Sequence, residues 1–287
     1  MTSDFLRRYV RYESNGTASF GLLDGDTIRQ LDGPSYDGGR PTGVTVRLAG
    51  VKLLVPVDPE AISKVIGMVD NYPKAGSERP AAAHPFISPK MQTSLITDGE
   101  AIEIPPESTH ARHEGSLVLI IGREARNVSI ADAPSYVFGV TAGNDVTEED
   151  WLWRKGGNLV PDRILAKAND SWGPIGTTIV TGLDYNDLAI ETKVNGRVAA
   201  SGRTGDMINN VARLVHYISH YCTLLPGDVI YTGSPGVSDA SGIKPGDTVA
   251  VTIEGVDTLT NPVVARKRDN APKFWLEMLE QAKQAAG

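Results

Sequence analysis

Residues 114–122 read Glu-Gly-Ser-Leu-Val-Leu-Ile-Ile-Gly, and this stretch decides the fold. It holds an uninterrupted apolar run that ends at Gly122. Such a run is typical of a strand whose two faces are both buried. A second apolar segment, from Tyr136 to Val146, predicts another buried strand. Acidic side chains therefore lie at the ends of two core strands, with Glu114 before the first and Asp145 at the end of the second.

Short strands are also predicted on both sides of this pair. Alternating residues and the Asp24-Gly25-Asp26 turn give the N-terminal part a β-rich character. Helical spacing of apolar residues predicts helices over Asp206 to Cys222 and Lys273 to Ala286. We therefore expect a mixed β/α+β fold, with a small N-terminal β domain over residues 1–57 and a second, larger domain over residues 58–287.

Charge and composition narrow the class of protein. The chain has 28 Lys and Arg against 35 Asp and Glu, a net charge of −7, which offers no basic field for nucleic acid. No apolar stretch is long enough to predict a membrane span. The single cysteine, Cys222, rules out an internal disulfide, and the N-terminus lacks the apolar core of a signal peptide, so we expect a cytoplasmic protein. With one cysteine and five histidines, any bound metal must rest mainly on carboxylates.

The carboxylates at the two strand ends suggest a metal site. Two carboxylates that share a cleft can hold Mg²⁺ while water completes its shell. Lys167 lies in Lys-Ala-Asn-Asp170, and a lysine near such carboxylates can balance charge or orient an enolate oxygen. From spacing alone, the alternative is that Glu114, Asp145 and Asp170 are solvated turn residues.

Several motifs occur in one order along the chain: Glu114 to Gly122, Asn144-Asp145-Val146-Thr147, Lys167-x-x-Asp170, Leu225 to Gly233 and Lys244-Pro-Gly-Asp247. In this order and spacing, the chain resembles the fumarylacetoacetate hydrolase family from about Ile66 to Val264. The resemblance implies a β roll or barrel as the catalytic domain, preceded by a small β domain. It also implies a homodimer that acts on a small acidic substrate.

The activity implied by the resemblance is a C–C bond hydrolase or lyase acting on a small keto-enol (β-diketo) acid. In that chemistry Mg²⁺ or Mn²⁺ stabilises the enolate released by bond cleavage. Carried onto this chain, the metal ligands are Glu114, Asp145 and, at the position of the family's second glutamate, Ser116. The remaining implied site residues are the catalytic Glu78, Lys167 and Asp170, and the substrate-binding Tyr72, Ser171, Thr232 and Gly233.

Three positions depart from the family pattern. Ser116 is neutral where a glutamate is usual, and hard cations depend on ligand charge. Ala75 replaces a water-activating histidine in the irregular stretch from Asn71 to Pro89, which we expect to form a lid. His84 in that stretch is an alternative proton carrier to Glu78. Glu149 stands where many members have arginine.

These departures leave other activities open. A dehydratase, tautomerase or decarboxylase on the same scaffold needs no hydrolytic water, which suits the loss of the histidine. A metal-free member with a non-hydrolytic or binding role suits the loss of the glutamate. The sequence does not name the substrate.

Overall fold

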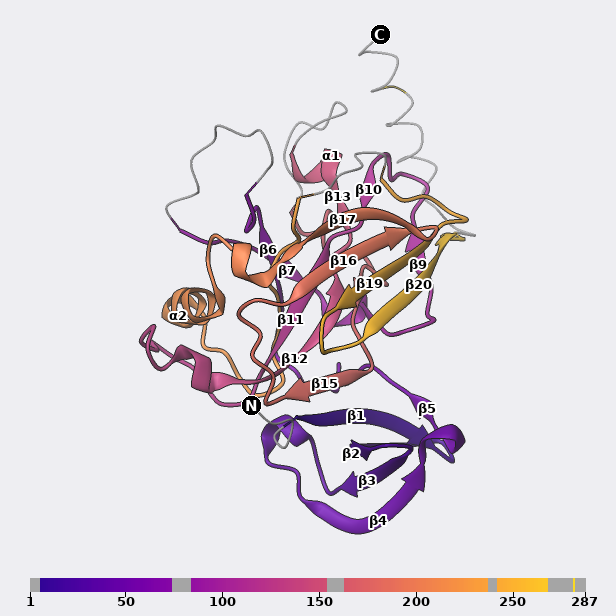
Figure 1. The fold of residues 1–287 in the computed structure, drawn as a ribbon. Coiled ribbons are helices and arrows are strands. Elements are labelled where there is room, and N and C mark those ends of the chain that lie inside the picture. Colours follow the sequence, from indigo (N-terminus) through magenta and orange to yellow (C-terminus); the bar gives the residue numbers. More distant parts are fainter. Residues whose placement is uncertain (1–5, 74–83, 154–162, 237–241, 268–280, 282–287) are drawn as a thin grey trace.

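The computed structural model describes residues 6–73, 84–153, 163–236, 242–267 and 281. Within them, strands dominate and two sheets build the molecule (Figure 1). The mixed β/α+β class expected from the sequence is confirmed. The C-terminal helix expected over Lys273 to Ala286 lies almost wholly outside the described residues. None of the described helices is long and apolar enough to span a membrane.

The larger sheet has 11 strands. Its strands, in spatial order, are β4 (Pro41–Arg47), β3 (Thr27–Leu31), β2 (Thr17–Asp24), β1 (Arg7–Ser14), β15 (Thr178–Thr181), β12 (Val137–Asn144), β11 (Gly115–Ile121), β18 (Val229–Tyr231), β6 (Val65–Val69) and β7 (Phe86–Lys90), with β5 (Lys52–Leu53) beside β1. Most pairs are antiparallel, and β18 and β6 run parallel.

The second sheet has five strands, in the order β17 (Arg197–Arg203), β16 (Ala189–Val194), β19 (Thr248–Ile253), β20 (Thr258–Ala265) and β9 (Ile102–Ile104). Two short pairs complete the strands: β10 (Ala111–Arg112) with β13 (Thr147–Glu148), and β14 (Gly173–Pro174) with β8 (Leu95–Ile96).

The main core lies between the two sheets. Every residue of β11 is buried, as its uninterrupted apolar run predicts, and β11 and β12 contact β16 and β19 of the facing sheet. A glycine permits the closest approach. A Cβ atom at Gly115 would lie 2.1 Å from Thr192 Oγ1, so only a residue without a side chain fits there. The sheets are therefore held tightly together beside Glu114.

Helices are short and few in the described residues. They are α1 (Glu149–Leu152), α2 (Val211–Tyr221) and the 3₁₀ turns η1 (Ser35–Asp37), η2 (Leu48–Gly50), η3 (Gln92–Ser94), η4 (Ala133–Tyr136) and η5 (Thr204–Asp206). The helix predicted from Asp206 starts later, because the Asn210 side chain accepts a hydrogen bond from the Arg213 amide and caps the first turn.

The N-terminal strands extend the larger sheet. Val10 of β1 pairs with Thr178 of β15, and Figure 1 shows β1 to β5 in indigo and purple at one end of the molecule beside β15. A small separate core of Val10, Tyr12 and Ile28 supports them. The domain boundary at residue 57 stays a prediction.

One sequence expectation is wrong at its C-terminal end. The stretch from Asn71 to Pro89 was expected to be irregular, but β7 begins at Phe86 and pairs with β6, with Pro89 opposite Ile66. Proline is compatible with this position because β7 is the outermost strand of the sheet. The strand ends at Lys90, whose side chain is buried.

Candidate functional site

Backbone and side-chain hydrogen bonds hold the ends of β11 and β12 together. The Glu114 amide donates to Asn144 Oδ1 over 2.8 Å, and the Asp145 amide donates to the Glu114 carbonyl over 2.9 Å. Gly115 lies opposite Asn144 in the register. The two carboxylates that the sequence placed at strand ends are therefore neighbours in space.

Lys167 joins these two carboxylates. Its Nζ lies 2.5 Å from Glu114 Oε2 and 3.0 Å from Asp145 Oδ2. The Lys167 and Asp145 side chains are fully buried, whereas that of Glu114 is 25% exposed. Glu114, Asp145 and Lys167, three of the site residues expected from the sequence, are therefore in contact, and of these only Glu114 is partly exposed to solvent.

A second lysine, which the sequence analysis missed, completes the cluster. Lys90 Nζ lies 2.8 Å from Asp145 Oδ1 and also donates a hydrogen bond to the Lys167 carbonyl. Its side chain is fully buried. The available signal was the alternation in β7, which places Ser88 and Lys90 on the same, inward face.

Close packing fixes the position of Asp145. A Cβ atom at Gly67 of β6 would lie 2.3 Å from Asp145 Oδ2, so the carboxylate rests directly against the backbone of that strand. The Tyr231 ring lies 5.9 Å from Lys90 Nζ, and its hydroxyl donates to the Gly173 carbonyl. Asp145 is thus enclosed by a glycine and two ammonium groups.

The carboxyl groups of Glu114 and Asp145 have pKa values that shift in opposite directions. Burial raises the pKa of Glu114, and the nearby Lys167 only partly offsets this effect. Burial acts on Asp145 in the same direction, but Lys167 and Lys90 outweigh it and lower the pKa of that carboxyl. Lys167 is also buried, yet Asp145 and Glu114 raise its pKa. Burial lowers the pKa of Lys90.

The expected metal ligands do not form a set that suits a divalent cation. Ser116 is fully buried, and its hydroxyl donates to the Glu114 carbonyl over 3.0 Å. Both oxygens of Asp145 and one of Glu114 already contact ammonium groups. Among the described residues, no group of three or more His, Cys, Asp or Glu side chains is arranged to hold a metal ion. Their assignment as metal ligands stays a prediction.

Two segments, one after β6 and one after β18, contain three of the expected substrate-binding residues: Tyr72, Thr232 and Gly233. Asn71 donates to the Thr232 carbonyl over 2.7 Å and accepts from the Asn209 amide. Gly233 has φ +98°, a conformation that favours glycine, and Thr232 and Tyr72 are buried. Asn71 therefore fixes the turn that contains Thr232 and Gly233. Their contact with substrate stays a prediction.

The other expected residues that the structure describes make their recorded contacts away from the cluster. Asp170 is exposed, and its backbone carbonyl accepts from Arg266 over 2.7 Å. Ser171 is buried, and its hydroxyl accepts from the Glu103 amide. Glu78 and Ala75 lie outside the described residues. His84 is exposed and stacks on Tyr217.

Charged groups flank the cluster on the β10–β13 side. Glu149, at the position where arginine is common, forms an ion pair with Arg112. Glu148 is buried and accepts from the His110 amide over 2.8 Å; burial raises its pKa. These contacts join the β10 strand to the segment that follows Asp145.

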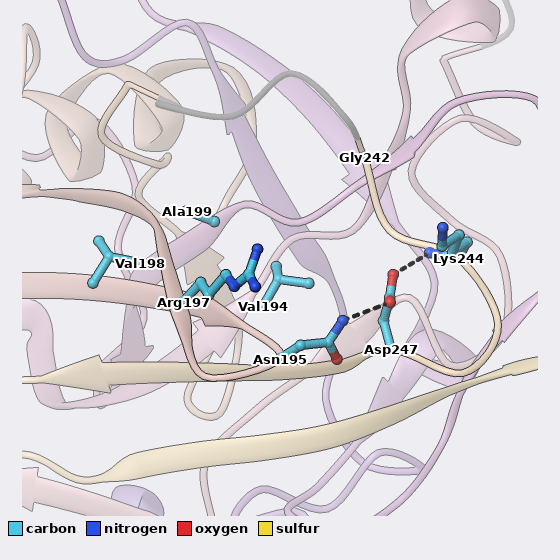
Figure 2. A pocket seen from close by; sticks show the side chains of 8 residues that line it. All are labelled: Val194, Asn195, Arg197, Val198, Ala199, Gly242, Lys244 and Asp247. Atoms are coloured by element: carbon cyan, nitrogen blue, oxygen red, sulfur yellow. Dashed lines mark hydrogen bonds between the residues drawn. The ribbon is translucent and has the colours of Figure 1, made fainter.

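A cavity of about 470 Å³ lies elsewhere, at the turn between β16 and β17 (Figure 2). Arg197 and Lys244 line it, and Asp247 accepts hydrogen bonds there from the Asn195 side chain and the Lys244 amide. None of the expected site residues lines this cavity. The acidic and basic cluster at Asp145 therefore remains the candidate functional site.

Comparisons with known proteins identify the family of the chain. Residues 64–264 match the family model described as fumarylacetoacetate (FAA) hydrolase C-terminal, and residues 7–56 match one described as Rv2993c-like, N-terminal. Protein Rv2993c of Mycobacterium tuberculosis is 36% identical over 272 residues, which cover 90% of this chain and 98% of that protein. Oxaloacetate tautomerase fahd2 of Xenopus laevis is 33% identical over 227 residues, 75% of this chain and 69% of that protein.

Solved structures share the fold. The 5-carboxymethyl-2-hydroxymuconate delta-isomerase of Mycobacterium smegmatis is 35% identical, covers 90% of this chain and all of its own, and superposes with a TM-score of 0.80. A more distant structure, maleylpyruvate hydrolase from Sphingobium, was determined with manganese(II) and pyruvate. It is 23% identical, covers 91% of this chain and all of its own, and has a TM-score of 0.71.

Proposed function

Because the chain belongs to the fumarylacetoacetate hydrolase family, we propose that it is an enzyme of small keto-enol acids that moves a proton between carbon and oxygen, as a tautomerase or isomerase. The observation that carries this proposal is the contact between Glu114 and Lys167, 2.5 Å apart at the solvent-reached end of the cluster. A carboxylate and an ammonium group placed side by side are the pair that enolisation requires.

In this mechanism Lys167 binds the substrate carbonyl oxygen and stabilises the negative charge that develops there. Glu114 accepts the proton from the neighbouring carbon through Oε1, the oxygen that Lys167 does not hold. The same carboxyl group then delivers this proton to the enolate oxygen, which completes the transfer from carbon to oxygen. The pKa of Asp145 is lowered, whereas that of Glu114 is raised. Asp145 therefore stays ionised and keeps Lys167 charged. No step passes through a metal ion.

The names of two relatives support this reaction class. One is called an oxaloacetate tautomerase and the other a delta-isomerase of a hydroxymuconate. The first name describes keto-enol isomerisation and the second double-bond isomerisation, each of an acid with more than one carboxyl group. Ala75, at the position of the family's water-activating histidine, also favours a reaction that consumes no water.

The C–C hydrolase or lyase implied by the resemblance is the second candidate. It is favoured by the buried ion pair of Lys167 and Asp145, 3.0 Å apart, because an enolate needs the same stabilisation by Lys167 whether it arises by proton loss or by bond cleavage. Glu78 would then activate water. From the sequence, we also keep the proposal of a cytoplasmic homodimer.

The test uses oxaloacetate in D₂O, followed by NMR. Tautomerase activity predicts enzyme-dependent exchange at the carbon next to the carbonyl, with the carbon skeleton intact; a lyase predicts a shortened product. We expect Lys167→Met and Glu114→Gln each to lose at least about 100-fold in rate, the usual size of a lost acid–base or electrostatic contribution. Asp257→Ala, at an exposed turn of the second sheet, serves as the control for folding. Exchange that is unchanged in both variants would refute the proposal.

A further inference from the structure

Four charged side chains form one row of alternating sign. Lys90 lies at the buried end, Asp145 follows at 2.8 Å, Lys167 at 3.0 Å and Glu114 at 2.5 Å. Only Glu114 is exposed to solvent. Two ammonium groups therefore balance two carboxylates, and the formal charge of the row is zero.

A neutral row of this kind is a poor receptor for a divalent cation. Affinity for hard cations rises with the number of charged oxygen ligands, and a buried charge without compensation is strongly unfavourable. Each oxygen of Asp145 already contacts an ammonium group, so an ion would have to displace at least one of them. The carboxylate has no room to turn toward β6, because it rests against Gly67.

Ser116 contributes no charge to the row. It lies two residues after Glu114 at the start of β11, and its hydroxyl is directed to the Glu114 carbonyl 3.0 Å away. A glutamate at this position would bring the formal charge to −1. The row is therefore neutral because Ser116 adds no negative charge and because Lys90 adds a second positive charge.

We propose that Lys90 and Lys167 together replace a divalent cation in this site, so that the enzyme binds and stabilises the enolate oxyanion without metal. This inference rests on the proposed function. An ammonium group has three donors. Lys167 uses two on Glu114 and Asp145, and the third serves the substrate oxygen at the exposed end of the row.

Lys90 acts as a positioning residue in this arrangement. It forms an ion pair with Asp145 Oδ1 and donates a hydrogen bond to the Lys167 backbone carbonyl, so it holds both the counter-ion and the main chain of the catalytic lysine. Its loss would leave the row with a net charge of −1 and with an open Asp145 oxygen. Metal affinity should then rise, which a merely structural lysine would not cause.

The experiment measures Mn²⁺ binding to the full chain by electron paramagnetic resonance and calorimetry. We expect no saturable binding to the natural sequence at millimolar Mn²⁺. Ser116→Glu should create a single site, and adding Lys90→Met to it should tighten binding about tenfold or more. Ser116→Gln has the size of the glutamate without its charge, and should bind no Mn²⁺. Thermal melting of each variant verifies that it is folded.

Each outcome decides the inference. Saturable Mn²⁺ binding to the natural sequence that Glu114→Gln abolishes would overturn it, as would a folded Ser116→Glu variant that binds no Mn²⁺. If Ser116→Glu does not fold, Lys90→Met alone is measured, and the same rise in Mn²⁺ affinity is required of it. Failure of the proposed function is a separate result: the metal measurements stand even if no keto-enol acid reacts, whereas an activity that depends on Mn²⁺ would refute the inference alone.

Discussion

Glu114 and Asp145 are similar groups with different surroundings. Asp145 lies between two lysines and against a glycine, without exposure to solvent, whereas Glu114 keeps one oxygen away from Lys167 and is partly exposed. Their pKa values accordingly shift in opposite directions. Two carboxyl groups can thus serve as a fixed anion and as a proton carrier at neutral pH.

This difference predicts the pH dependence of the rate. Glu114 works as a base only when it is ionised, and its pKa is raised, so activity should fall as the pH drops through a value above about 4.3, the ordinary pKa of glutamate. The measurement is kcat/KM against pH for the natural protein and for Glu114→Asp, whose shorter carboxyl should move the acidic limb. An acidic limb at or below the ordinary glutamate value would contradict the assignment.

Gly67 offers a direct test of the packing around Asp145. In Gly67→Ala the new methyl group would meet Asp145 Oδ2 at 2.3 Å, so the carboxylate must shift away from Lys167. We expect about a 100-fold loss of activity, the size associated with a displacement near 1 Å in an active site. Gly50→Ala is the matched control, since no atom lies within 4 Å of its new methyl group. Equal activity in the two variants would show that Asp145 tolerates displacement.

Strand pairing explains how much of the site the sequence could reveal. The strands β11 and β12 could be predicted from their own residues, because an uninterrupted apolar run is typical of a strand buried on both faces. Lys90 was not predictable in the same way. Pro89 argues against a strand unless its edge position is known, and that position depends on pairing with β6, a tertiary contact. The approach of Lys167 to both carboxylates was implied by the resemblance but not by spacing, because spacing along the sequence does not show which distant residues meet in the fold.

Asp228 joins the segment before β6 to the turn before β18. Its buried carboxylate accepts from the Ser63 and Lys64 amides at 3.1 and 2.9 Å and from the Leu225 amide at 2.8 Å, and it forms an ion pair with Lys64. Asp228→Ala removes the acceptor of these partly buried donors, so we predict a loss of about 1–3 kcal/mol in the free energy of unfolding.

Urea unfolding measures this change. Asp228→Asn, which keeps the shape and part of the acceptor capacity, should lose less than the alanine variant. Asp257→Ala, at an exposed turn of the second sheet, should change stability by no more than about 0.5 kcal/mol. A loss for Asp228→Ala as small as that of the control would show that the turn is held by other contacts.

The molecule is built around one long sheet to which the N-terminal strands contribute. β1 covers the edge of β15, and Arg8 donates to the carbonyls of Val256 and Gly255 in the second sheet. The N-terminal unit is therefore bound to both sheets. A boundary at residue 57 can be drawn in the sequence, but the strand pairing crosses it.

Removal of residues 1–57 tests this dependence. The shortened chain would expose the pairing groups of β15, and an uncovered strand edge promotes association between chains. We predict a lower melting temperature and concentration-dependent aggregation, measured by calorimetry and light scattering. A shortened chain that melts at the same temperature and stays monodisperse would show that the remainder folds independently.

The two outermost strands of the larger sheet, β4 and β7, restrict how copies of this protein can assemble. β4 begins with Pro41 and β7 contains Pro89, so proline interrupts the row of backbone donors at both margins. Neither margin is well suited to accept a strand from another copy. A homodimer of this chain is therefore not expected to form by strand pairing across the margins of the larger sheet.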